Sequence, residues 1–189
     1  GDHLLRLIDD VLDLARLDAK GLSFSADPVG VPDVVAEVME TLKPSAAEAG
    51  VSLQCGPPPA ELPSIEADRG RYVQILLNLG SNGIKYNRHG GSVTFTMSSG
   101  PVGVRVAVTD TGIGIAPEHQ SQIFQPFFRA GQETGPIEGT GIGLAISRRL
   151  AEMMGGAVGF RSAYGVGSEF WVDIPAHAAA ALPPAQSRG

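Results

Sequence analysis

Apolar residues recur along this chain at two spacings, which separate the segments expected to be helical from those expected to be strands. Spacings of three and four residues predict helices over 2–20, 31–49, 142–154 and from Asp68 to the Gly90-Gly91 pair, with a shorter helix at 117–123. Alternating apolar and polar residues predict strands over 51–55, 93–97, 102–108, 157–162 and 168–174. The segment 22–30 is expected to be extended, and 129–140 to be a mobile loop.

The first predicted helix carries an apolar stripe that it cannot bury alone. Charged residues, namely Asp9, Asp10, Asp13 and Arg16, alternate with the members of the stripe, which are Leu4, Leu5, Ile8, Val11, Leu12 and Ala15. A single amphipathic helix has to bury such a stripe against another element. We expect this helix to pack on the domain that follows it or on a partner helix.

Composition narrows the class of protein. Hydrophobic residues make up 43% of the 189 residues and charged residues 18%, which suits one packed domain with appendages. A net charge of -6 argues against nucleic-acid binding, which needs a basic surface. Cys55 is the only cysteine, so an intrachain disulfide is excluded and a reducing, cytoplasmic location is expected. No apolar run reaches membrane-spanning length.

Asp110-Thr111-Gly112-Ile113-Gly114 follows a predicted strand and is the first candidate ligand-binding segment. A carboxylate accepts hydrogen bonds, and the exocyclic amine of adenine donates them. Gly112 and Gly114 would let the chain turn tightly behind a base. An ordinary strand-ending turn has the same sequence, and for this segment alone that interpretation is the stronger one.

The helix that begins at Asp68 carries a second candidate segment. Asn78 and Asn82 lie one helical turn apart on the same face, and Lys85 and Tyr86 follow. Amide oxygens suit Mg²⁺, which takes few protein ligands when phosphates are present. Lysine can contact a phosphate, and tyrosine can stack on a base. A solvated helix surface is the alternative interpretation. The glycines within this helix make that alternative weaker, because glycine destabilises a helix and its presence suggests a packing or ligand reason.

A third segment, Gly139-Thr140-Gly141-Ile142-Gly143-Leu144, precedes a predicted helix. Free backbone amides at a helix N-terminus attract phosphate, although a simple loop would have the same composition. Arg129 could reach a terminal phosphate, and a surface arginine is nearly as good an interpretation. Neither glycine segment fits the dinucleotide fingerprint, and no P-loop sequence occurs.

Together, these motifs resemble those of the catalytic ATP-binding domain of sensor histidine kinases from two-component signalling. The order and spacing match over roughly residues 1–175. The asparagine box corresponds to 78–86, and the phenylalanine box to 124–129. The first, second and third glycine boxes correspond to 110–114, 139–144 and 165–170.

The resemblance implies a fold and a set of ligands. The fold is the Bergerat-type α/β sandwich of two layers, in which helices cover one face of a mixed sheet, preceded here by one long N-terminal helix. The ligands are ATP and Mg²⁺. The residues implied to bind them are Asn78, Asn82, Lys85, Tyr86, Asp110, Gly112, Gly114, Phe124, Phe127, Arg129, Gly139, Thr140, Gly141, Ile142, Gly143 and Leu144.

The resemblance also implies roles for individual residues. Asp110 is expected to recognise adenine, and Asn82 to ligate Mg²⁺ with Asn78 nearby. Lys85 and Arg129 are expected to contact phosphates, so these two and Asn78 form the catalytic set. Residues 124–140 are expected to form a lid over ATP, which Phe124 and Phe127 anchor.

The domain boundaries follow from the same resemblance. Residues 1–21 resemble the second helix of the dimerisation domain, 22–175 form the catalytic domain, and 176–189 form a disordered tail rich in alanine and proline. The helix that carries the acceptor histidine is absent, because no His-Glu or His-Asp pair occurs. We therefore expect a piece of a longer, dimeric kinase, itself a monomer or a weak dimer. The expected partners are the acceptor-histidine domain and the receiver domain of a response regulator.

Two other functions remain open at this stage. The ATPases of the same superfamily carry a glutamate, which activates water, four residues before the metal-binding asparagine. Asn78 stands at that position and cannot act as a general base, which disfavours rapid hydrolysis. The second alternative is a non-catalytic module that uses this fold to bind nucleotides or protein partners.

Overall fold

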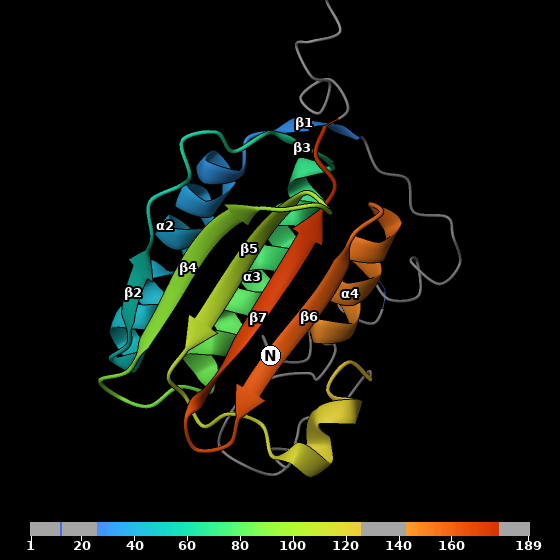
Figure 1. The fold of residues 1–189 in the computed structure, drawn as a ribbon. Helices are drawn as coiled ribbons and strands as arrows, with labels where there is room; N and C mark the ends of the chain where they lie inside the picture. The colour runs from blue at the N-terminus through green and yellow to red at the C-terminus, as the bar shows by residue number, and fades with distance from the viewer. Residues whose placement is uncertain (1–11, 13–25, 126–142, 178–189) are drawn as a thin grey trace, which may run out of the picture.

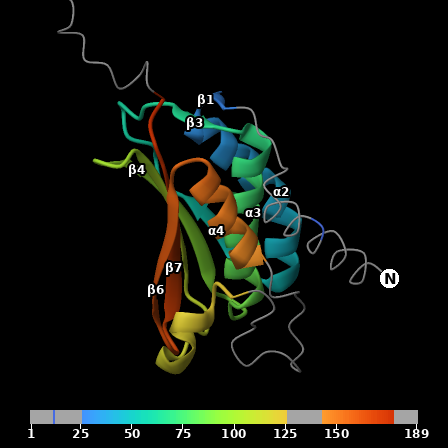
Figure 2. The same ribbon diagram turned by 90° about the vertical axis from the view of Figure 1, so that its right-hand side faces the viewer.

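The protein folds into two layers, with helices packed on one face of a β-sheet. The computed structural model describes residue 12 and residues 26–125 and 143–177. Figures 1 and 2 show the sheet as one layer and the helices α2 (Val31–Ala49), α3 (Arg69–Lys85) and α4 (Gly143–Met153) as the other. The predicted two-layer α/β sandwich is therefore confirmed. The predicted helix over 2–20 lies, apart from Leu12, outside the described residues.

The main sheet is mixed, as predicted. Its strand order is β2-β4-β5-β7-β6, in which β2 pairs with β4 in parallel and the other pairs are antiparallel. The bounds are Ser52–Cys55 for β2, Ser92–Ser99 for β4, Val104–Asp110 for β5, Ala157–Ala163 for β6 and Gly167–Ile174 for β7. A short 3-10 helix, η1 (Pro117–Gln122), follows β5.

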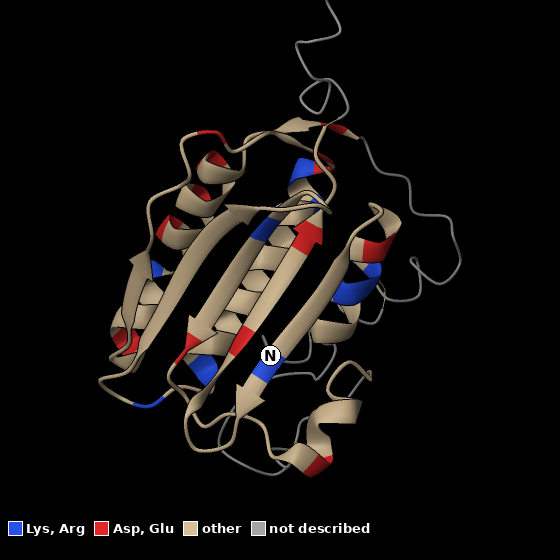
Figure 3. Ribbon diagram, viewed as in Figure 1, with Lys and Arg blue, Asp and Glu red and all other residues tan. Residues whose placement is uncertain are grey.

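The open face of the sheet carries paired charges of both signs (Figure 3). Arg105 on β5 makes a bidentate ion pair with Asp173 on β7, with N–O distances of 2.8 and 3.0 Å. Arg161 on β6 pairs with Glu169 on β7 at 2.6 Å.

Among the described helices, none has both the length and the apolar character that a bilayer-spanning segment requires.

A second, two-stranded sheet was not predicted from the sequence. It pairs β1 (Asp27–Val29) with β3 (Ile65–Ala67) in antiparallel register. Ala176 bridges to Ile65, and the backbone amide of His177 donates to the carbonyl of Ser64 at 2.8 Å. The prediction of a disordered tail from residue 176 was therefore wrong for Ala176 and His177, which this pairing fixes. The rest of the tail lies outside the described residues.

The central helix α3 begins where the sequence predicts and ends earlier. The Asp68 carboxylate caps it by accepting from the backbone amide of Arg71 at 3.2 Å. Helical geometry stops at Lys85, before the predicted Gly90-Gly91 stop. The Asn87 side chain donates to the carbonyl of Ser92 at 2.8 Å, which turns the chain toward β4 instead of continuing the helix.

Gly80 brings α3 close to its neighbours. The family that the motifs resemble usually has a larger apolar residue at this position, so the sequence predicts a softer helix here. In the structure, a Cβ on Gly80 would lie 2.5 Å from Leu42 Cδ1 and 3.0 Å from Phe95 Cζ. Leu42 and Phe95 are buried and fill the space that a larger residue would need. The glycine is therefore explained by packing.

Tyr72 provides a test of the core. Its side chain is fully buried, and its hydroxyl has no hydrogen-bond partner among the described residues. Burial, with a smaller effect of the Asp173 charge, raises the pKa of this phenol, so it stays neutral. Because an unsatisfied buried hydroxyl is costly, we expect Tyr72→Phe to stabilise the fold by about 1 kcal/mol in urea unfolding.

The matched control is Tyr164→Phe, since Tyr164 is 68% exposed and should show no change. A loss of stability in Tyr72→Phe would mean that the hydroxyl is satisfied, and would contradict this account.

Candidate nucleotide-binding site

Two of the predicted motifs and the start of α4, which carries the last two residues of the second glycine box, lie toward one end of the molecule. The C-terminal ends of α3 and β5 and the N-terminal end of α4 all lie toward the lower part of the sheet in Figure 1. Gly83 on α3 lies directly over Asp110, because a Cβ built there would be 3.6 Å from Asp110 Cβ. The asparagine box and the first glycine box are therefore neighbours in space.

Asp110 is the last residue of β5, and its carboxylate is held by two backbone amides. Its Oδ1 accepts from Gly112 N–H at 2.9 Å and from Ser168 N–H, on β7, at 3.2 Å. Its Oδ2 makes no hydrogen bond within the described part of the chain, so one acceptor oxygen remains for a ligand. Burial raises the pKa of the Asp110 carboxyl, and the two amide bonds oppose this only in part.

The glycines of the first box are required by close packing of the backbone. A Cβ on Gly112 would collide with the carbonyl oxygen of Tyr86, and a Cβ on Gly114 with that of Ala163. Gly114 also has a φ of 71°, which glycine tolerates and other residues rarely adopt. The sequence suggests a tight turn behind a base. In the structure, this turn packs between the end of α3 and the β6–β7 hairpin.

Asn78 joins the asparagine box to the start of α4. Its Nδ2 donates to the carbonyl of Gly143 at 3.3 Å and to the hydroxyl of Ser147 at 3.1 Å. Ser147 is fully buried, so this contact fixes how α4 lies against α3. The N-terminus of α4 is thereby held beside the asparagine face of α3, where its free amides favour an anion.

Asn82 is the best-placed residue for a metal ion. Its side chain is half-buried and makes no hydrogen bond within the described ranges, so its amide oxygen remains available. The described residues contain no group of three His, Cys, Asp or Glu side chains that could hold a metal by themselves. One amide oxygen fits Mg²⁺, which keeps waters and takes further oxygens from phosphates.

The structure also describes Lys85, Tyr86 and Leu144. Lys85 is the last residue of α3 and is exposed, while Tyr86 caps the helix and is half-buried. The Tyr86 carbonyl accepts from the backbone amide of Ile113 at 3.0 Å, which ties the asparagine box to the first glycine box a second time. Leu144 follows Gly143 in α4 and packs against the core.

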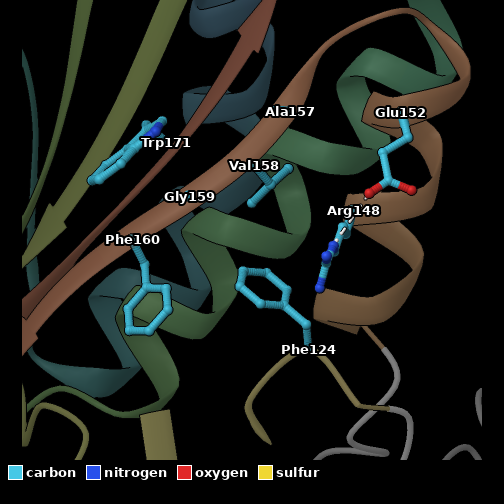
Figure 4. Close-up of a pocket in the computed structure, with 8 residues that line it drawn as sticks. All are labelled: Phe124, Arg148, Glu152, Ala157, Val158, Gly159, Phe160 and Trp171. Atoms are coloured by element: carbon cyan, nitrogen blue, oxygen red, sulfur yellow. Dashed lines mark hydrogen bonds and ion pairs between the residues drawn. The ribbon is translucent and has the colours of Figure 1, made fainter. Parts of the chain in front are cut away.

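Phe124 lies apart from Asp110, beside the edge strand β6. Its ring meets that of Phe160 edge-on, with centroids 5.9 Å apart, and the Arg148 guanidinium lies 5.4 Å from its centroid. Figure 4 shows these side chains around a shallow pocket of about 430 Å³. Of the predicted site residues that the structure describes, Phe124 alone lines this pocket. The pocket is therefore distinct from the Asp110 site.

Several predicted site residues lie outside the described residues. They are Phe127, Arg129, Gly139, Thr140, Gly141 and Ile142, together with the rest of the predicted lid after Gln125.

Two residues at the site were not identified from the sequence. Ser147 receives the Asn78 amide, and Arg88 donates to the carbonyls of Gly112 and Gly165. A serine facing inward from an otherwise apolar helix face was an available signal for Ser147. No local pattern indicates Arg88, because its two acceptors are distant in sequence.

Comparisons with known proteins agree with this geometry. A family model described as "Histidine kinase-, DNA gyrase B-, and HSP90-like ATPase" matches residues 67–178. The histidine protein kinase DivJ of Caulobacter vibrioides is 36% identical over 175 residues, which cover 93% of this chain and 29% of DivJ. The chain thus spans under a third of the length of this curated relative.

Solved structures give the same result. Full-length ShkA in complex with AMPPNP is 41% identical with a TM-score of 0.82, and the match covers 93% of this chain and 36% of that one. The nucleotide-free catalytic domain of histidine kinase ThkA is 28% identical with a TM-score of 0.68, covering 82% of this chain and 97% of that one.

Gly112→Ala tests the packing of the first glycine box. The added methyl group would press on the Tyr86 carbonyl, which is backbone and cannot rotate away. We expect a loss of about 1–3 kcal/mol in unfolding free energy, together with weaker nucleotide binding. Gly100→Ala is the control, since a Cβ there meets nothing within 4 Å and should leave both quantities unchanged. Equal stability of the two variants would contradict the packing account.

Asp110→Asn tests the raised pKa of the carboxyl. The folded protein holds the Asp110 proton more readily than the unfolded chain does, so the charged form costs stability at pH 7. We expect the variant without ligand to melt at the same or a higher temperature than the wild type at pH 7. The difference should narrow as the pH falls toward the ordinary aspartate pKa of about 3.9.

Thermal melts of both proteins between pH 7 and pH 4 measure this difference, in which the other titrating groups cancel. A variant that is less stable than the wild type at pH 7, by a margin that shrinks as the pH falls to 4, would mean that the carboxylate is stabilised in the fold.

Proposed function

Because this chain belongs to the family of histidine kinase-, DNA gyrase B- and HSP90-like ATPases, and is a catalytic ATP-binding domain of the sensor histidine kinase type, we propose that it transfers the γ-phosphoryl group of ATP to a histidine. The accepting histidine belongs to a separate helical domain of the longer protein. The receiver domain of a response regulator is the expected next acceptor, and a cytoplasmic location suits this relay.

The observation that carries the proposal is the state of the Asp110 carboxylate. Two backbone amides fix one oxygen, and the other has no hydrogen bond among the described residues, in a partly buried place where a ligand could meet it. Adenine offers an amine donor that matches a fixed acceptor. Burying this carboxylate costs free energy, and a ligand that donates a hydrogen bond to it best explains why the fold keeps it there.

The neighbouring residues are proposed to bind the metal ion and the phosphates. Asn82 would present its amide oxygen to Mg²⁺, which, when bound, neutralises phosphate charge. The N-terminus of α4, braced by Asn78, would offer backbone amides to the phosphates. Lys85 and, from the segment beyond the described residues, Arg129 would add positive charge. Phosphoryl transfer needs mainly such positioning and charge stabilisation.

The choice of kinase over hydrolase rests on Asn78. Its Nδ2 donates two hydrogen bonds, to Gly143 and Ser147, and an amide does not take a proton from water. The γ-phosphoryl group should therefore persist until a histidine nucleophile arrives. A non-catalytic regulatory module remains the alternative outcome of the experiment below.

Phosphoryl transfer tests the proposal directly. The chain is mixed with the helical domain of its own parent protein and with labelled ATP, and acid-labile, base-stable label on the helical domain is expected. Asn82→Ala should lower the transfer rate about 100-fold, because it removes a charge-positioning ligand. Its affinity for ADP without Mg²⁺ should stay close to that of the wild type.

Arg69→Ala is the control, because Arg69 lies at the opposite end of α3, where it pairs with Glu37 on the surface. ATP binding without transfer would favour the regulatory module. Release of free phosphate at a rate equal to transfer would favour an ATPase.

A further inference from the structure

Arg88 connects two loops that meet at the Asp110 carboxylate. It follows α3 in the turn that leads to β4. Its Nη2 donates to the carbonyl of Gly112, in the first glycine box, at 2.9 Å and to the carbonyl of Gly165, in the β6–β7 turn, at 3.0 Å. These acceptors are 24 and 77 residues away in sequence. One nitrogen atom therefore bridges segments that nothing local would hold together.

The base of the Arg88 side chain is itself fixed. Its backbone amide donates to Asn87 Oδ1 at 2.8 Å, and the same oxygen accepts from the Thr111 hydroxyl at 3.2 Å. The Asn87 Nδ2 donates to the Ser92 carbonyl. The guanidinium is thus presented from a turn that is fastened to the ends of β4 and β5.

The two bridged loops contain or adjoin the amides that hold Asp110, since Gly112 lies in the first glycine box and Ser168 lies in β7, just after the β6–β7 turn. Gly112 accepts from Arg88 through its carbonyl and donates to Asp110 through its N–H. The β6–β7 turn, which carries Gly165, leads directly to Ser168, the second amide donor to Asp110. Gly165 N–H also donates to the Ile113 carbonyl at 2.6 Å, so the loops touch beside the arginine.

We infer that Arg88 is a positioning residue for adenine recognition, which acts by holding the Gly112 and Ser168 amides in place against Asp110. Without the bridge, the two loops keep the backbone bond between Gly165 and Ile113 but lose the side-chain contact to the Gly112 carbonyl, and the free oxygen of Asp110 is less firmly directed. This inference rests on the proposed function, because it assigns a task within the adenine site.

Substitutions of Arg88 that keep or remove the hydrogen-bond donor test the inference. Since both hydrogen bonds come from a single nitrogen, the ammonium group of a lysine can replace it, whereas a methionine of similar length cannot. The experiment compares Arg88→Lys and Arg88→Met by calorimetric titration of the chain with ADP. It also records the backbone amide NMR signals of Gly112 and Ser168 without ligand.

We expect Arg88→Met to raise the ADP dissociation constant roughly tenfold, equivalent to about 1.4 kcal/mol. Arg88→Lys should stay within about threefold of the wild type, because a cation that donates to the same carbonyls preserves most of the interaction. The Gly112 and Ser168 signals should move in the methionine variant and hold in the lysine variant. Arg69→Ala, which removes an exposed arginine far from the site, should change neither quantity.

Wild-type affinity in Arg88→Met, or unmoved Gly112 and Ser168 signals beside weakened binding, would overturn the inference. If Arg88→Met does not fold, Arg88→Gln serves in its place, with the same loss expected, because its amide nitrogen ends two bonds short of the Nη2 position. Failure of the wild-type chain to bind ADP would instead refute the proposed function, so the two failures are distinguishable.

Discussion

The Asp110 carboxylate, held by two backbone amides in a partly buried place, is the constraint on which the rest of the site depends. Desolvation disfavours its charge, and the Gly112 and Ser168 amides compensate only in part. Those amides come from the first glycine box and from strand β7, so the carboxylate has its direction only when β5, β7 and the glycine box are assembled. Under the proposed function, recognition of the base would depend on this whole end of the sheet.

The close packing around this carboxylate explains residues that look like ligand contacts in the sequence. Gly83 lets α3 lie over Asp110, and Gly112 and Gly114 let the loop pass beside the Tyr86 and Ala163 carbonyls. Asn78 then fixes α4 against α3 through Gly143 and the buried Ser147. The same contacts that build the core at this end also place the groups expected to meet phosphate and metal.

Periodicity and motif order predict the two-layer sandwich, its mixed sheet and nearly every main strand, because these depend on local patterns. The β1–β3 pair was missed because Ile65–Ala67 is too short to alternate, and its pairing with Ala176 joins distant segments. The end of α3 was misplaced because the Asn87–Ser92 contact, and not the glycine pair, turns the chain. The roles of Arg88 and Ser147 were not predicted from the sequence for a related reason, because their partners are distant in the chain.

The central claim is that the free oxygen of Asp110 reads the amine of adenine. The most direct measurement compares the affinity of the wild-type chain for ADP and for IDP, whose base carries a carbonyl oxygen where adenine carries the amine. A hydrogen bond to a charged group contributes about 1.5–3 kcal/mol, so ADP should bind roughly 10- to 100-fold more tightly. Equal affinities would contradict the claim that Asp110 recognises the base.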